Sequence, residues 1–120
     1  MTTTTRVVAI LTVTGIDAER DHYVQVLGLS EVMNHGWIVT LADETGHQQI
    51  SLMTTDQTAA VNPSASIEVD DVDASYAIAL EQGLEIVHEL QNEPWGVRRF
   101  FFRDSSGNVI NVLSHRYSGT

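Results

Sequence analysis

Histidines are the residues of this chain best suited to metal binding or proton transfer, because imidazole titrates near neutral pH. They form neither a His-x-His pair nor the His-Glu-x-x-His motif of zinc peptidases. We therefore expect each to act singly, as a polar or packing residue, and only the last to lie close enough to the end of a predicted strand to reach a ligand. The five are His22, His35, His47, His88 and His115.

Other catalytic constellations are missing from the sequence. It has no cysteine and no lysine, which excludes disulfides, thiolate zinc sites, Cys nucleophiles and Schiff-base chemistry. It also has no Gly-x-Ser-x-Gly nucleophile elbow, no Gly-x-Gly-x-x-Gly fingerprint and no Walker loop. The acidic stretch 68–73 lacks the glycine and the terminal Glu of a calcium loop. No catalytic residue and no metal ligand is therefore predicted.

The composition is that of an acidic protein. Sixteen acidic and six basic residues give a formal charge of −10 and a pI of about 4.6. Such a surface repels phosphate backbones and anionic lipids, so we expect neither a nucleic-acid nor a membrane partner. The longest aliphatic run, residues 7–11, is too short to cross a bilayer, and the N-terminus does not resemble a signal peptide. We expect a cytoplasmic protein whose charge would favour a cationic ligand.

An internal repeat of about half the chain length organises the sequence. Three short phrases recur in the same order in the second half: Ile16-Asp17-Ala18 as Val72-Asp73-Ala74, Gly28-Leu29 as Gly83-Leu84, and Asp43–Gly46 as Asp104–Gly107. Asn62-Pro63 marks the boundary, because proline disfavours helix in the residue before it. The sequence thus predicts a flexible tail, 1–5, and a single domain, 6–117, made of modules 6–60 and 62–117.

Each copy predicts a strand, a helix and three more strands. β-branched, alternating segments predict the strands. Asp17 and Asp73 are expected to cap the helices, and Gly28 and Gly83 to end them. In the first copy the helix is expected at 17–27 and the strands at 7–13, 29–33, 36–43 and 48–54. In the second the helix is expected at 73–82 and the strands at 65–69, 84–90, 97–103 and 109–114.

One helix can cover only one face of a four-stranded sheet, so the other face needs a partner. Two such units side by side would form a curved, open, eight-stranded mixed sheet, and its uncovered side would be a natural ligand cleft. The predicted fold class is therefore α+β, with two βαβββ modules around a cleft.

The most specific phrase of the sequence is Glu93-Pro-Trp-Gly-Val-Arg-Arg-Phe-Phe-Phe-Arg-Asp-Ser-Ser-Gly-Asn-Val-Ile-Asn111. Together with the repeat and the phrases Tyr23–Leu29 and Glu68–Ala74, it resembles the vicinal oxygen chelate superfamily. That superfamily includes glyoxalase I, extradiol dioxygenases, fosfomycin resistance enzymes and bleomycin resistance proteins. The resemblance covers about residues 6–115 and implies the two-module fold with a functional cleft.

Metal-dependent enzymes of this superfamily take one His, Gln or Glu ligand from each of four strands. The resemblance places these positions at Val8, at Gln49 or Ser51, at Ser64 and at Asn111. Valine cannot coordinate, and the side chains of serine and asparagine are neutral, weak ligands. The resemblance therefore implies a cleft without a metal and without a cofactor.

A cleft without a metal can still bind a small molecule through aromatic and polar side chains. Trp37 could instead belong to the core, whereas Trp95 is expected at the rim. Strand alternation puts Arg98 with Phe100 and Phe102 on one face, but does not say which face lines the cleft. The predicted ligand-binding residues are Trp37, Gln49, Ser51, Trp95, Arg98, Phe100, Phe102, Asn111 and His115.

These residues suggest a metal-free protein of the bleomycin-resistance kind, which binds an aromatic or cationic small molecule, such as a drug or natural product, without transforming it. The resemblance also implies a homodimer. One alternative is a metal-dependent lyase or isomerase resembling glyoxalase I, with a divalent metal held by Gln49, His47 or His115. The other is a catalytically idle regulatory or interaction module.

Overall fold

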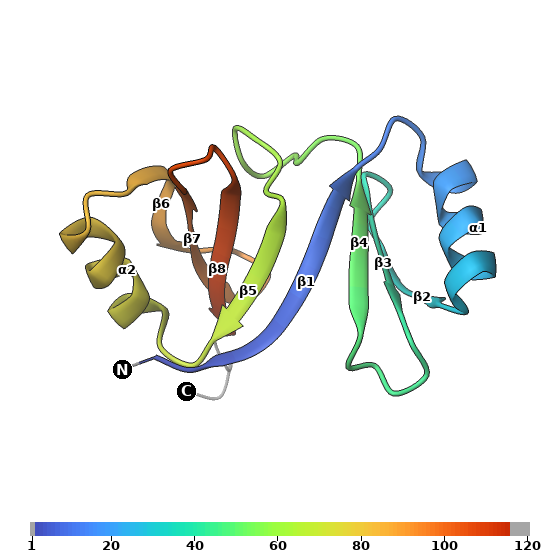
Figure 1. Ribbon diagram of the computed structural model, residues 1–120, viewed down its shortest axis with the longest axis horizontal. Coiled ribbons are helices and arrows are strands. Elements are labelled where there is room, and N and C mark those ends of the chain that lie inside the picture. The colour runs from blue at the N-terminus through green and yellow to red at the C-terminus, as the bar shows by residue number, and fades with distance from the viewer. Residues whose placement is uncertain (1, 116–120) are drawn as a thin grey trace. The chain divides into compact units, whose positions relative to one another are not determined.

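The computed structural model of the chain describes residues 2–115. It is an α+β protein with two helices and eight strands in an open, mixed sheet (Figure 1). The order βαβββ occurs twice, which confirms the predicted repeat and fold class. The elements are β1 (Thr4–Thr12), α1 (Ile16–Leu27), β2 (Ser30–Asn34), β3 (Ile38–Ala42), β4 (Gln49–Met53), β5 (Ala65–Val69), α2 (Val72–Glu81), β6 (Glu85–Asn92), β7 (Val97–Arg103) and β8 (Val109–His115).

The chain divides into two compact units. We call residues Val8–Ser64 the α1 unit, and the described residues 2–7 and 65–115 the α2 unit. Residues 2–5 of the expected tail, 1–5, lie in the α2 unit, and residue 1 is outside the described residues. Strand β1 begins at Thr4, and the backbone N–H of Thr3 donates to Asp70 Oδ1 at 2.7 Å. The backbone of Thr3 is therefore held by the side chain of Asp70, directly after β5.

The α1 unit buries one face of its strands under its helix. Its strands lie in the order β2-β3-β4-β1, with β1 parallel to β4 and the other pairs antiparallel. The buried contacts to α1 form one hydrophobic cluster: Ile16, Val39, Leu41 and Leu52. Burial of side chains of this size stabilises a fold by about 1.5–3 kcal/mol each.

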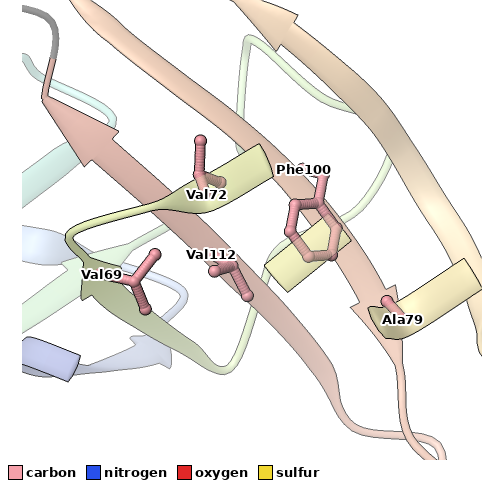
Figure 2. Packing of buried hydrophobic residues seen from close by; sticks show 5 residues of the cluster. All are labelled: Val69, Val72, Ala79, Phe100 and Val112. Carbon is pink, nitrogen blue, oxygen red and sulfur yellow. The ribbon is translucent and has the colours of Figure 1, made fainter. Parts of the chain in front are cut away.

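The α2 unit repeats this arrangement. Its strands lie in the order β5-β8-β7-β6, with β5 parallel to β8 and the other pairs antiparallel. Figure 2 shows the cluster between α2 and the strands, which consists of Val69, Val72, Ala79, Phe100 and Val112.

The expected helix starts are wrong, and the expected helix ends are confirmed. Gly15 is the N-cap of α1, which begins at Ile16, so Asp17 lies inside the first turn. In α2 the cap is Asp71, whose side chain accepts from the backbone N–H of Ala74 at 3.1 Å. Burial of the first helical residue, Ile16 or Val72, moves each start ahead of the Asp that the sequence suggested. Gly28 has a left-handed φ of 69° and ends α1; Gly83 does the same after α2 with a φ of 71°.

Neither of the helices in the described part of the chain has the length and apolar character needed to span a membrane.

Candidate functional site

The side chains of strand β7 alternate between a face that packs against α2 and a face turned away from it. Phe100 is only 1% exposed and meets Tyr76 of α2 edge-on, with ring centroids 5.0 Å apart. Phe102 packs against the same cluster, so the face with Phe100 and Phe102 lies toward α2. The alternate residues, Arg99 and Phe101, therefore face away from α2. This packing shows which face of β7 the helix α2 covers.

Arg98, on the helix-facing side, is joined to α2 itself. Its guanidinium donates to the carboxylate of Asp73 at 2.8 Å and to the side chain of Asn92 at 3.2 Å. The hydrogen bond from Arg98 lowers the pKa of Asp73 and raises the pKa of Arg98. Three predicted ligand-binding residues, Arg98, Phe100 and Phe102, thus make contacts that attach or cover α2.

The face turned away from α2 carries a buried ionic cluster, which we call the Glu93 cluster: His88, Glu93 and Arg99. Arg99 Nε lies 2.6 Å from Glu93 Oε2, and His88 Nε2 lies 3.1 Å from the same oxygen. The side chains of Glu93 and Arg99 are only 8% and 6% exposed. Charges so far from water are tolerated only when they are paired and hydrogen-bonded, as they are here.

Aromatic rings enclose the guanidinium of the Glu93 cluster. Its central carbon lies 5.0 Å from the centre of the Trp95 ring system and 4.8 Å from that of Phe101. Phe101 is fully buried, whereas Trp95 is 52% exposed. The tight turn that presents Trp95 is closed by the backbone N–H of Gly96, which donates to the Glu93 carbonyl at 3.2 Å. Trp95 is thus held in place by Arg99 while much of its surface stays in solvent.

Asn111 lies beside this cluster with an unused hydrogen-bonding group. It pairs with Phe101 across β7 and β8, and with Ser66 across β5 and β8. Its Nδ2 donates to Ser66 Oγ at 2.9 Å. Its Oδ1 is the one buried side-chain oxygen or nitrogen in residues 2–115 that lacks a hydrogen-bond partner. A buried acceptor without a partner is costly, and a ligand donor could satisfy it.

His115 ends the same face of the α2 unit. Its Nδ1 contacts Oε2 of Glu68, and the other carboxylate oxygen, Oε1, accepts from the hydroxyl of Thr5 at 3.1 Å. Arg6 Nε lies 3.9 Å from that carboxylate. His115 thus belongs to a partly exposed group of polar residues rather than standing alone.

The remaining predicted residues belong to the α1 unit. Ser51 is buried on the strand face away from α1, and its hydroxyl hydrogen-bonds to that of Thr40 at 2.8 Å. Gln49 donates to the Gly46 carbonyl at 3.0 Å, next to a turn. Trp37 is half-buried just before β3, and its carbonyl accepts from the backbone N–H of Thr54 at 3.0 Å.

The donors present do not fit a catalytic divalent metal. Within residues 2–115, no group of three or more His, Cys, Asp or Glu side chains is arranged to hold one. In the α1 unit, Val8 pairs with Gln49 on adjacent strands, which puts an aliphatic side chain at one of the expected ligand positions. In the α2 unit, Ser66 rather than Ser64 lies beside Asn111. Such neutral side chains are poor ligands for a catalytic ion.

Several of these site residues were missed from the sequence. The sequence shows Glu93 only as part of the phrase that resembles the superfamily, and it predicts that His88 acts singly. Alternation leaves open the direction of the strand face that carries Arg99 and Phe101. Strand alternation did contain a signal, because it set Arg99 and Phe101 together. The pairing of His88 with Phe101 across β6 and β7 involves a register shift that alternation cannot predict.

Comparisons with known proteins agree with this fold. A family model described as Glyoxalase/Bleomycin resistance protein/Dioxygenase superfamily matches residues 5–112. No curated protein matches the sequence.

Solved structures similar to this chain include a member of the glyoxalase/bleomycin resistance protein/dioxygenase superfamily from Vibrio splendidus 12B01 (TM-score 0.70, 18% identity, 93% of this chain and 99% of that one). Another is methylmalonyl-CoA epimerase from Mycobacterium tuberculosis (TM-score 0.65, 20% identity, 95% of this chain and 88% of that one). A third is the Mn(II)-bound glyoxalase from Novosphingobium aromaticivorans (TM-score 0.65, 22% identity, 92% of this chain and 38% of that one). At these identities the likeness shows the fold alone.

Proposed function

The chain belongs to the glyoxalase/bleomycin resistance protein/dioxygenase superfamily, and we propose that it is a metal-free member that binds a small molecule without transforming it. The ligand lies on the face of the α2 unit that carries Asn111, Phe101 and Trp95. Sequestration of a drug or natural product is the role that such binding would serve.

The observation that carries this proposal is the unpartnered Oδ1 of buried Asn111. A folded chain rarely leaves a buried acceptor unsatisfied, because the group loses its hydrogen bonds to water and gains none. A ligand N–H or O–H would restore that hydrogen bond. Because Ser66 already accepts from the amide nitrogen, the oxygen is the end left to select the ligand.

The surroundings of Asn111 favour a neutral aromatic ligand over a cationic one. Aromatic faces attract cations through their negative π-surface. At Trp95 and Phe101 this attraction is already used by the guanidinium of Arg99. The charge of Arg99 is in turn balanced by Glu93. A flat, uncharged ring with one hydrogen-bond donor therefore matches this face better than an ammonium group.

The chemistry of the donors supports binding without a metal. Asn111 and Ser66 are neutral, and the nearby carboxylate of Glu93 is paired with both Arg99 and His88. Releasing that carboxylate to a metal would break its 2.6 Å ion pair with the buried guanidinium of Arg99, which is costly. The competing function is a metal-dependent lyase or isomerase that resembles glyoxalase I.

Exposed apolar side chains on the α1 unit support the homodimer that the resemblance implies. Val26 is 79% exposed, Leu27 57% and Val32, on strand β2, 59%. We propose that the protein is a homodimer and that it is cytoplasmic.

Ligand binding can be tested through Trp95 alone, because Trp37 is the only other tryptophan. In a Trp37→Phe background we expect naphthalene-2-carboxamide to quench the fluorescence of Trp95. Its N,N-dimethyl derivative has no N–H for Asn111 and should bind about tenfold more weakly, which is the effect of one lost hydrogen bond. In Asn111→Leu the two compounds should bind equally. Equal affinities in the Trp37→Phe parent would overturn the role of Asn111.

Metal dependence is tested separately, by titration calorimetry of the purified protein with Ni²⁺ and Mn²⁺. We expect no stoichiometric binding at micromolar metal. Binding of one ion per chain, together with lyase or isomerase activity that a chelator abolishes, would establish the enzyme instead. A protein that binds neither metal nor any aromatic amide would be the idle module.

A further inference from the structure

The α2 unit has a hollow on the face opposite Asn111. It has a volume of about 390 Å³ and lies between α2 and the strands, where Ile67, Phe100, Phe102 and Ile110 are among its lining residues. We propose that this hollow binds a neutral molecule that is mostly hydrocarbon and carries one hydrogen-bonding group, as a medium-chain alcohol does.

The hollow opens to solvent and is large enough to hold a ligand. Cavities that hold small ligands begin at about 300 Å³. The hollow exists because α2 meets the sheet through a small residue, Ala79, beside the ring of Phe100 (Figure 2). Ile78, which also lines it, stays 53% exposed, so a molecule that fills the hollow would cover apolar surface now in water.

The lining excludes charged ligands. None of the residues that line the hollow has an ionisable side chain, although the chain as a whole carries a formal charge of −10. A carboxylate or an ammonium group would lose its hydration here without gaining an opposite charge. An uncharged ligand avoids that cost.

Two polar side chains, Ser75 on α2 and Gln82 at its C-cap, account for the single hydrogen-bonding group. Both line the hollow, and neither side chain makes a hydrogen bond to another described residue. A hydroxyl on the ligand can donate to or accept from either of them. Two further hydroxyls, of Thr2 and Thr4, also line the hollow, and that of Thr2 already donates to Asp70. Along the rest of the lining, hydrocarbon would contact hydrocarbon. A saturated chain with one terminal hydroxyl matches this division.

The inference does not depend on the proposed function. Ile110 and Val112 turn toward the hollow, whereas Asn111 between them turns to the other face of β8. A substitution of Asn111 therefore leaves the hollow intact, and a substitution of Ala79 leaves Asn111 and Trp95 intact.

The test compares 1-octanol with octanoate at pH 7 by thermal shift and titration calorimetry. We expect 1-octanol to raise the melting temperature and to bind at least about tenfold more tightly than octanoate. Ala79→Leu fills the hollow and should abolish the effect of 1-octanol. Ala77→Leu adds the same side chain at an exposed position of α2 and should preserve it, as should Asn111→Leu.

Three results would overturn the proposal. Equal affinity for octanoate would contradict the exclusion of charge, and binding that persists in Ala79→Leu would place the site elsewhere. A wild-type protein without any response to 1-octanol would make the hollow a packing defect or the seat of a second copy, and sedimentation would separate those two. If Ala79→Leu does not fold, methyl NMR of the wild type decides: 1-octanol must shift the resonances of Ile67 and Ile110.

Discussion

The α1 unit and the α2 unit resemble each other on the side of their helices and differ on the other side. Toward the helix, each packs aliphatic or aromatic residues of its central strands, such as Leu41 and Leu52 in one and Phe100 and Val112 in the other. On the opposite face the α1 unit has a pair of buried hydroxyls, Thr40 with Ser51. The α2 unit has buried charges and an unsatisfied amide there.

The two copies of the repeat differ mainly in the residues on the strand face that the helix does not cover. The helix-facing residues must fill a core, so both copies keep apolar side chains there. The other face is not needed to hold the helix, and polar groups on it must be justified by partners or by ligands. In the α2 unit, Glu93 and Arg99 form a buried ion pair and Asn111 has an acceptor without a partner, so this copy has polar groups that a ligand could contact. In the α1 unit, the hydroxyls of Thr40 and Ser51 hydrogen-bond to each other.

Of the substitutions that test this difference between the units, Glu93→Gln is expected to lower the free energy of unfolding most. The substitution breaks the buried ion pair between Glu93 and Arg99, which should lower the free energy of unfolding by about 3 kcal/mol. Urea denaturation measures that loss. In a Trp37→Phe background, the fluorescence of Trp95 should change as well, because Arg99 contacts its ring.

The double variant Glu93→Leu with Arg99→Met is the matched control. It removes both charges and keeps apolar volume, so it should be more stable than Glu93→Gln. If Glu93→Gln costs no more than an ordinary surface substitution, the buried pair is not what distinguishes the α2 unit.

The corresponding change in the α1 unit should be smaller. Thr40→Val removes one hydroxyl of a neutral pair and leaves that of Ser51 without its partner, at a cost of about 1 kcal/mol. Adding Ser51→Ala removes the second hydroxyl too and should recover part of that loss. Urea denaturation of the single and double variants gives both values. If Thr40→Val lowers the free energy of unfolding as much as Glu93→Gln does, the polar groups on the two strand faces contribute equally to stability.

Much of the fold could be predicted from the sequence because its signals are local. Strand alternation placed Phe100 and Phe101 on opposite faces of β7, and glycine at a left-handed position correctly ended α1 at Gly28. The start of α1 was missed because its cap is Gly15 and buried Ile16 is its first residue. The start of α2 was missed because a different aspartate, Asp71, forms the cap.

The site could be predicted only in part, because its contacts join distant segments. Nothing in the spacing of His88, Glu93 and Arg99 reveals that they share one buried oxygen. The direction of β7 depended on which face α2 covers, and this is decided by packing between elements rather than by the pattern within one. Asn111 was found through a family phrase, but its unsatisfied oxygen needed coordinates.

The recurring Asp-x-x-Gly turns offer the finest comparison of the two units. In the α1 unit, the Thr45 hydroxyl donates to both carboxylate oxygens of Asp43 at 2.9 Å. In the α2 unit, Asp104 accepts from the side chain of Asn108 at 2.9 Å and from its backbone N–H at 2.8 Å. Hydrogen bonds to the charged form lower the pKa of both carboxyls, with the side-chain bond the largest cause in each turn.

The smallest expected effect is a change in acid sensitivity that is confined to one turn at a time. Because folding lowers the pKa of Asp43 and of Asp104, their contribution to stability is complete above the pKa of the unfolded chain, about 3.9, and is lost as the pH falls through the lower folded pKa. Thr45→Val should raise the pKa of Asp43 toward its ordinary value and leave Asp104 unchanged, and Asn108→Ala should do the reverse. Carboxyl ¹³C NMR titration follows both groups in one experiment. Because Asn108→Ala keeps the backbone donor to Asp104, its shift should be incomplete; a complete return to the ordinary pKa would show that the backbone N–H contributes nothing there.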